Sequence, residues 1–499
     1  MTPPPNLLPA LPSPRPRKSS AIRIILFSVL LAVIGVLIIP GYYVEERIRG
    51  KMAWEKYAAE AGQRGVKLDF ADFIPPKIPD NENFASIPIF DAAFQAMEKD
   101  KPVPNPFKKP AVKGVEHPPL SDANKQTLID LAEWQKYFVK TGQLPAAGDN
   151  AAKDILRVLT AFDAPLAQLH EAETRPHCRF PVHWEKGLAA NLGHYEVIQS
   201  AAQIEALRLS AHLALGDSPA AYEDFHHGFG LATAFREEPV TISGLVRVNI
   251  AVTLGNAVWS GLARHQWGEP ELRKIEADVS AVDWLKDFEF AMSSERAVTN
   301  QIFDTLIGHP QQMVTLLHNE DPGGKKWSWI LWGYPSGWIY QSKLRMNRFF
   351  DEILARTDAG QHRWFGERPI PSSATNLKEQ GESFHYFAFR LMAPVLETVE
   401  NNCIHMAVLA DESRLACVLE RFHLVHGQYP GTLTELVPEY IPTLPADLAN
   451  GAPYHYHLTP KGRFLLYSVG PNQRDDFGVI NPKLRAREQL DWVWCYPVK

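Results

Sequence analysis

The chain has 499 residues, of which 45% are hydrophobic and 22% are charged, so it is long enough for two or more globular domains. A net charge of -6, without a basic stripe interleaved with aromatic residues, gives no support for nucleic-acid binding. The four cysteines form no C-x-x-C pair, which argues against zinc ribbons and thioredoxin-like sites.

The N-terminal region has the features of a membrane anchor. Residues 1–20 are proline-rich and basic without an acidic residue, which predicts a disordered tail. Residues 22–44 are largely apolar and end near Tyr42 and Tyr43, and about 20 such residues cross a ~30 Å hydrocarbon core as a helix. The stretch exceeds a signal-peptide core, and no A-x-A cleavage site follows it. We therefore expect one uncleaved transmembrane helix in a lipid bilayer.

The orientation of this helix depends on flanking cations that are evenly balanced. Four lysines and arginines lie shortly before the apolar stretch, and four lie shortly after it. Long domains are translocated largely regardless of their charge, whereas a short basic tail is easily kept inside. We expect a single-pass protein of the inner (cytoplasmic) membrane, with a cytoplasmic N-terminus and a periplasmic body.

The remaining chain divides by composition into three parts and predicts a mainly α fold. Residues 45–80 indicate a charged helical stalk and a proline-rich linker, and residues 81–395 indicate a multi-helix body. Within the body, Gly216 ends one helix, Ser218 and Pro219 begin the next as N-cap and N1, and Gly268 marks a further stop. Residues 321–340 carry four tryptophans, which indicate either core packing or a ligand or headgroup surface.

Residues 396–499 are expected to form a long helix followed by a small α+β module. The helical pattern runs over residues 383–427, and Gly427 is a C-cap residue. Residues 454–458 and 464–469 alternate with period 2 around a turn at Gly462, which predicts an antiparallel hairpin. A lone hairpin is marginal, so the preceding helix is expected to cover one of its faces.

This C-terminal part resembles the C-terminal domain of the major pseudopilins of type II secretion. In that family a helix leads into a G-x-Y-P turn, a short helix, a P-x-D loop, a small antiparallel sheet and an acidic loop. The matching residues, in chain order, are Gly427, Tyr429, Pro430, Leu433, Leu436, Pro445, Asp447, Tyr456, Tyr467, Ser468, Gly470, Asp475 and Asp476. The likeness covers about the last 90 residues.

Outside this module the chain departs from the pseudopilin pattern. The apolar stretch has no short leader and no glutamate near its start, and some 370 residues separate it from the module. Assembly into a pseudopilus is therefore not expected. The whole layout, with the segment PPKIPDNENFA near the membrane, resembles a group of uncharacterised membrane-anchored proteins of Verrucomicrobia and Planctomycetes.

The loop SVGPNQRDDFG is the candidate metal site. Ser468, Asn472, Asp475 and Asp476 offer the oxygen ligands that calcium takes from flexible loops. The pseudopilin resemblance implies calcium here as well, although Arg474 departs from the family's glycine-rich, acidic loop. The alternative is a solvated acidic turn whose carboxylates cap backbone amides.

The histidine pairs, one adjacent pair of charges and the cysteines give weaker indications of a site. Three pairs of histidines are interpreted as surface features, because two ligands do not make a metal site. These pairs are His455 with His457, His423 with His426, and His226 with His227. Glu295 and Arg296 are interpreted as a buried or an exposed ion pair. A disulfide such as Cys417 to Cys495 is compatible with an exported body, and the sequence leaves the pairing open.

No catalytic constellation emerges. A nucleophile elbow, an H-E-x-x-H helix, a P-loop and a Rossmann fingerprint are all missing from the sequence. The leading hypothesis is a membrane-tethered, non-enzymatic binding or scaffold protein of the cell envelope, with an envelope protein as partner. One alternative is an accessory protein of a secretion system related to pseudopilins. The other is an enzyme with a site between helical layers, which a deep pocket with buried carboxylates or histidines would favour.

Overall fold

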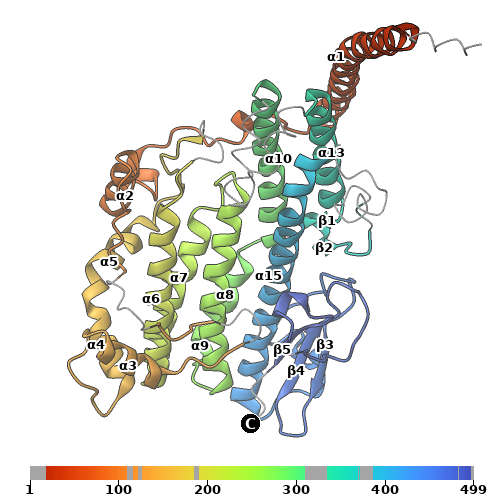
Figure 1. Cartoon of the computed structure of the whole chain (residues 1–499). Helices are drawn as coiled ribbons and strands as arrows, with labels where there is room; N and C mark the ends of the chain where they lie inside the picture. The colour runs from red at the N-terminus through yellow and green to blue at the C-terminus, as the bar shows by residue number, and fades with distance from the viewer. Residues whose placement is uncertain are drawn as a thin grey trace, which may run out of the picture.

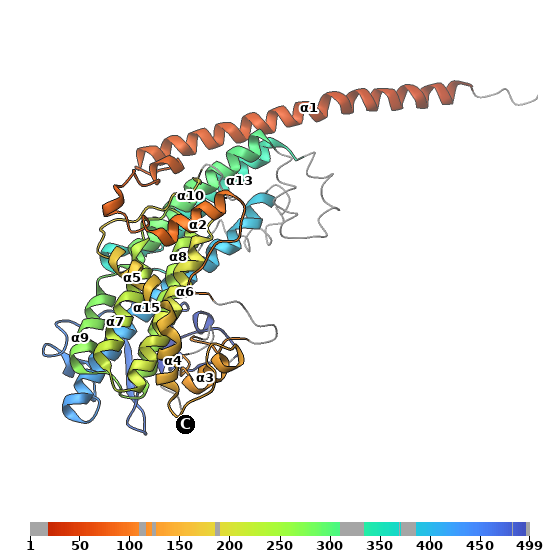
Figure 2. The same cartoon turned by 90° about the vertical axis from the view of Figure 1, so that its left-hand side faces the viewer.

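The computed structural model describes residues 18–108, 116–121, 126–184, 190–309, 334–368, 370, 386–481 and 483–495. A long N-terminal helix, α1, projects from a body of packed helices, and a small sheet lies at the end of the body far from the projecting part of α1 (Figures 1 and 2). The predicted fold class, mainly helical with a small C-terminal antiparallel sheet, is confirmed.

The body begins with four short helices and continues with longer ones. The short helices are α2 (Pro88–Glu98), α3 (Leu131–Lys140), α4 (Ala151–Leu159) and α5 (Asp163–Ala172). The longer helices are α6 (His194–Ala214), α7 (Ser218–Ala234), α8 (Thr241–Ala263), α9 (Glu269–Ser280), α10 (Trp284–Gly308) and α13 (Ser336–Leu354). Helices α6, α7 and α8 pack against one another in the middle of the body (Figure 1).

Local signals fix the turn between α6 and α7. Gly216 has a φ of +77°, a conformation that suits glycine, and it ends α6 as expected. The N-cap of α7 is Asp217 rather than the predicted Ser218, since the Asp217 carboxylate accepts from the Ala220 amide at 3.1 Å. The stop at Gly268 is also confirmed, because α9 begins at the next residue.

Helix α15 (Phe387–His426) runs along the body and ends beside the sheet (Figure 1). It contacts α8, α9, α10 and α13. Gly427 has a φ of +72° and caps the helix, as expected. The five consecutive residues 415–419 are all fully buried. Successive residues point about 100° apart around a helix, so α15 is covered on every side at this level.

The C-terminal sheet has three antiparallel strands in the order β3 (His455–Leu458), β4 (Phe464–Ser468), β5 (Trp492–Cys495). The predicted hairpin is confirmed, with His455 opposite Tyr467 and Leu458 opposite Phe464. Helix α15 covers one face of the sheet, as expected. The Tyr454 hydroxyl donates to Asp411 of α15 at 3.1 Å. A second, two-stranded sheet joins β1 (Thr357–Asp358) to β2 (Arg363–Trp364).

Helix α1 (Lys18–Gln63) runs without a break through both the predicted membrane segment and the predicted stalk. Its second half packs along α13, where Gly50 and Gly337 allow the two backbones to approach closely. Further along, the Tyr57 hydroxyl and the Arg64 guanidinium both donate to Asp351 of α13, at 2.9 and 3.0 Å. The stalk region is therefore attached to the body along most of its length.

In the first half of α1, the apolar residues that the structure describes have no protein cover. Ile24, Leu30 and Ile38 are 66%, 54% and 63% exposed. Among the residues searched for membrane spans, α8 alone is long and apolar enough. Most of α8 is buried inside the body, which is the environment of a core helix.

One sequence interpretation is wrong. Glu295 and Arg296 do not pair with each other. Glu295 accepts from the amide and hydroxyl of Thr241 at 3.1 and 2.8 Å, whereas Arg296 binds Asp351 at 3.0 Å. Cys417 is a buried free thiol and forms no disulfide with any described residue. Most of the tryptophan-rich segment, residues 321–333, and the Cys495 side chain lie outside what the structure describes.

Candidate functional sites

A group of charged side chains lies where α5, α6 and α7 pack together. We call it the acid–histidine cluster, and it consists of His170, Glu173, Glu205, Arg208, Asp224 and His227. Only parts of the cluster reach solvent, since the Glu205 side chain is 1% exposed and the His170 side chain is 28% exposed. Charged groups at this depth are costly unless they are paired or neutralised.

Two stacked imidazoles form the outer part of the cluster. The rings of His170 and His227 lie 3.6 Å apart and are nearly parallel. His170 Nε2 lies 2.8 Å from a Glu205 oxygen, and His227 Nδ1 lies 2.8 Å from a Glu173 oxygen. Burial, together with the charge on His227, lowers the pKa of His170 to about 4. Burial opposes protonation of His227 too, but the bond to Glu173 and its charge raise the pKa of His227. His227 therefore retains a proton to a higher pH than His170 does.

Two buried carboxyl groups form the inner part. Burial raises the pKa of both Glu205 and Asp224. The nearby charge of Glu205 raises the pKa of Asp224 further, whereas a hydrogen bond with Asp224 lowers the pKa of Glu205. Arg208 lowers both pKa values, and its Nε lies 3.1 Å from Asp224 Oδ1. One oxygen of each carboxyl lacks a hydrogen-bond partner among the described residues. Such a pair retains a proton to a higher pH than an exposed carboxyl does.

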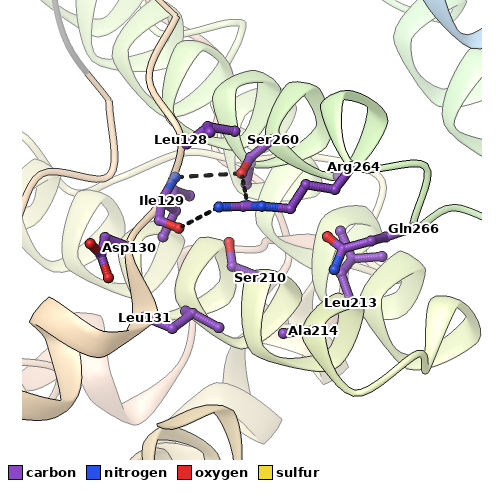
Figure 3. A pocket seen from close by; sticks show the side chains of 12 residues that line it. Leu128, Ile129, Asp130, Leu131, Ser210, Leu213, Ala214, Ser260, Arg264 and Gln266 are labelled. Carbon is purple, nitrogen blue, oxygen red and sulfur yellow. Dashed lines mark hydrogen bonds between the residues drawn. The ribbon is translucent and has the colours of Figure 1, made fainter. Parts of the chain in front are cut away.

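A cavity of about 430 Å³ opens between α3, α6 and α8 (Figure 3). Its walls are largely apolar and include Leu128, Leu131 and Leu213. The Arg264 side chain extends across it (Figure 3). The Arg264 guanidinium donates to Ser260 Oγ at 2.6 Å and to the Ile129 carbonyl at 3.3 Å, which leaves further N–H groups for a ligand. An apolar chamber with one guanidinium suits a small molecule with an anionic end.

The four residues of the predicted calcium loop do not point at one centre. Ser468 donates to the buried Asp447 at 2.7 Å, and Asn472 donates to Asp476 at 2.7 Å. Asp475 instead accepts from the Tyr467 hydroxyl at 3.0 Å and from the Phe477 amide at 2.8 Å.

The loop also has an acid that the sequence analysis missed. Asp491, before β5, accepts from the Asp476 and Gly478 amides at 3.0 and 2.8 Å. These contacts match the alternative of carboxylates that cap backbone amides, and calcium binding stays a prediction.

The three histidine pairs have different environments. His226 binds Asp278 at 2.9 Å at the surface, while its neighbour His227 belongs to the acid–histidine cluster. His455 lies 3.5 Å from Asp475, a neighbour that the sequence analysis did not place there. His426 binds the exposed Tyr440 hydroxyl at 3.0 Å.

His423 has two possible metal ligands as neighbours. Single ligand atoms of His265, Glu420 and His423 all lie within 4.8 Å of one another. His265 comes from the α8–α9 loop, whereas Glu420 and His423 lie one turn apart on α15. His423 is half-buried beside these two side chains, which its sequence neighbours did not indicate.

The sequence contained a signal for the acid–histidine cluster that was not used. Glu205 lies three and four residues after Ala202 and Ala201, on the apolar stripe that buries α6. A lone acid on such a stripe must find a partner or a proton inside the protein. His170 and Glu173 gave no comparable signal, because only packing brings α5 to this place.

No family model, curated protein or solved structure matches the chain, so functional inference rests on its own residues.

Proposed function

We propose that this chain is a membrane-tethered, non-enzymatic binding protein of the cell envelope, anchored in the inner membrane by α1 with its body on the periplasmic side. The observation that carries this proposal is α1 itself. One continuous helix has exposed apolar side chains in its first half and is packed on α13 in its second half. Water is a poor solvent for the first half, and a bilayer is a good one.

The packing of α1 on α13 also supports a fixed position of the body relative to the membrane. Glu46 is 5% exposed and receives a hydrogen bond from Gln341 at 2.7 Å, only a few residues after the exposed Tyr42 and Tyr43. Tyrosines favour the membrane interface. A body attached so near the interface stays close to the membrane surface instead of moving on a free tether.

The cavity beside Arg264 is the proposed binding site, and its ligand class is a small amphipathic anion. The side chains that line it include no histidine, and its one carboxylate, Asp130, caps α3 by accepting from the Ala132 and Glu133 amides at 2.9 and 3.1 Å. Without a free acid or base, the cavity supports binding rather than catalysis. The guanidinium would hold the anionic end, and the leucines would hold the apolar part.

An enzyme remains the second candidate, and the acid–histidine cluster favours it. Two buried carboxyls with raised pKa values beside a histidine whose pKa is also raised are the groups that general acid–base catalysis uses. Structural ion networks perturb pKa values in the same way, so binding at the Arg264 cavity is preferred.

Fractionation of cells that express the full chain tests the anchor. The chain should stay with the inner membrane through an alkaline carbonate wash and be released by detergent. Leu30→Arg should release it, because a central arginine costs about 3 kcal/mol on insertion. Protease added to spheroplasts should digest the body. A body that is protected there, or a chain that carbonate extracts, would overturn the corresponding part of the proposal.

Calorimetry on the full chain in lipid nanodiscs tests the cavity. The probe is 4-phenylbutyrate, and its uncharged amide is the control ligand. Arg264→Met should weaken phenylbutyrate binding about tenfold or more by removing a charge-assisted hydrogen bond, and it should leave amide binding nearly unchanged. Lys153→Met removes an exposed cation from α4 and is the matched control. Equal binding by the parent and Arg264→Met would argue against this site.

A further inference from the structure

We propose that His265, Glu420 and His423 bind one divalent transition-metal ion, with Zn²⁺ the preferred ion. The site lies where the α8–α9 loop meets the last turns of α15 and the start of the C-terminal module (Figure 1). Two imidazoles and one carboxylate are a ligand set that zinc accepts, with a water in the fourth position.

The distances are close to those that a metal ion requires. In a tetrahedral zinc site with bonds of about 2.1 Å, the ligand atoms lie about 3.4 Å from one another. The three ligand atoms already lie within 4.8 Å of one another. His265 Nδ1 and a Glu420 oxygen are 2.7 Å apart, and the two imidazole rings have centroids 4.6 Å apart. Small side-chain rotations would therefore complete the site without moving the helices.

Each ligand has features that fit a metal ion. The Nδ1 atom of His423 is buried and lacks a hydrogen-bond partner among the described residues, which is costly for a polar atom. Glu420 is fully buried on α15, and its side chain is held in place by the Tyr429 hydroxyl, which donates to Oε2 at 2.7 Å. Outer hydrogen bonds of this kind orient the ligands of metal sites.

One cation and one carboxylate set the charge around the three proposed ligands. Arg463 borders His423 and donates to the Ala263 carbonyl at 3.0 Å, so it adds a positive charge. The Glu420 carboxylate opposes it and makes the three residues attractive to a cation. The His265 side chain is 32% exposed, which gives an ion from solvent a route to the site.

A metal ion here would connect parts of the chain that are distant in sequence. His265 and Glu420 are separated by 155 residues, and Tyr429 belongs to the turn that begins the C-terminal module. Metal bonds across such a separation stabilise the folded state, because the ligand set does not exist in the unfolded chain. The expected consequence is a higher melting temperature in the presence of zinc.

The test uses the full chain in detergent, stripped with a chelator and then titrated with ZnCl₂ by calorimetry. The parent should bind one equivalent, and Co²⁺ in place of zinc should give the visible absorption of a tetrahedral site. His265→Gln and His423→Gln should each weaken zinc binding about 100-fold or more. Tyr429→Phe should weaken it about 10- to 100-fold, as expected for loss of an outer hydrogen bond.

Two variants serve as matched controls. His426→Gln changes the next histidine on α15, and His455→Gln changes the histidine beside Asp475 in the hairpin. Both should bind zinc as the parent does. His265 lies in a partly exposed loop, so its variant should melt like the parent without metal, which separates loss of binding from loss of folding. Failure of the parent to bind zinc at micromolar concentration, or parent-like binding by His265→Gln, would overturn the proposal.

Discussion

Substitution Gly337→Ala tests the attachment of α1 to the body. A Cβ at Gly337 would lie 2.8 Å from the Arg47 amide nitrogen and closer still to the Glu46 carbonyl. Ordinary contacts of a Cβ begin near 3.4 Å, so the two helices would have to separate by more than half an ångström. The obstructing atoms belong to the backbone of α1 and cannot rotate away.

The destabilisation caused by a Cβ at Gly337 is partly offset by the higher helix propensity of alanine. Overpacking costs about 1–3 kcal/mol, whereas replacing glycine by alanine inside a helix gains up to about 1 kcal/mol. Gly337 is in the first turn of α13, where the gain is smaller. We expect a net loss of about 1–2 kcal/mol in the free energy that holds α1 on α13. Local opening should then become about 5- to 30-fold more frequent.

Hydrogen–deuterium exchange of the full chain in nanodiscs measures this opening. Amides of residues 45–63 should exchange about 5- to 30-fold faster in Gly337→Ala, with little change in α6 and α7. Gly62→Ala is the matched control, since no described atom lies within 4 Å of a Cβ at that position of α1. Exchange in residues 45–63 that stays within twofold of the parent would refute the close packing of these helices.

Three further predictions concern the interior and the C-terminal loop. Burial raises the pKa of Asp224 and Glu205, so the folded state favours their protonated forms, and stability is lost as pH rises from about 4 through these raised pKa values. Asp224→Asn should reduce the slope of the unfolding free energy against pH by up to about 1.4 kcal/mol per pH unit, as measured by urea unfolding from pH 5 to 8. An unchanged slope would contradict the assignment of the raised pKa to Asp224. Asp447→Ala should lower stability by about 2–4 kcal/mol, because Ser468 and two backbone amides lose a buried acceptor, and a parent-like melting curve would speak against this. Millimolar calcium should raise the melting temperature relative to chelator if the predicted loop binds it, and an equal melting temperature would end that hypothesis.

The elements that follow from local patterns were predictable from the sequence. The end of α15 at Gly427 and the β3–β4 hairpin depend on a C-cap glycine, a turn glycine and period-2 alternation within a few residues. Strand β5 was not predicted, since its pairing partner β4 lies more than 20 residues away and no hairpin turn joins the two strands.

The candidate sites were much less predictable, because their members meet only through packing. Glu295 and Arg296 show why adjacency misleads: neighbours on a helix point about 100° apart, so each binds a different element. His423 and its sequence neighbours indicated no third ligand, and His265 enters from a loop 155 residues from Glu420. His227 likewise gains its stacked partner only when α5 packs against α7.

The burial of α15 on all sides affects how this chain can be divided. At residues 415–419 one side of the helix belongs to the body and another side supports the sheet, so both parts depend on the same turns. A fragment that stops before residue 415 would expose the apolar surface of the body that packs on α15. A fragment that begins after residue 419 would expose the face of the sheet that α15 covers. Expression boundaries placed within α15 should therefore yield insoluble material on either side of the cut.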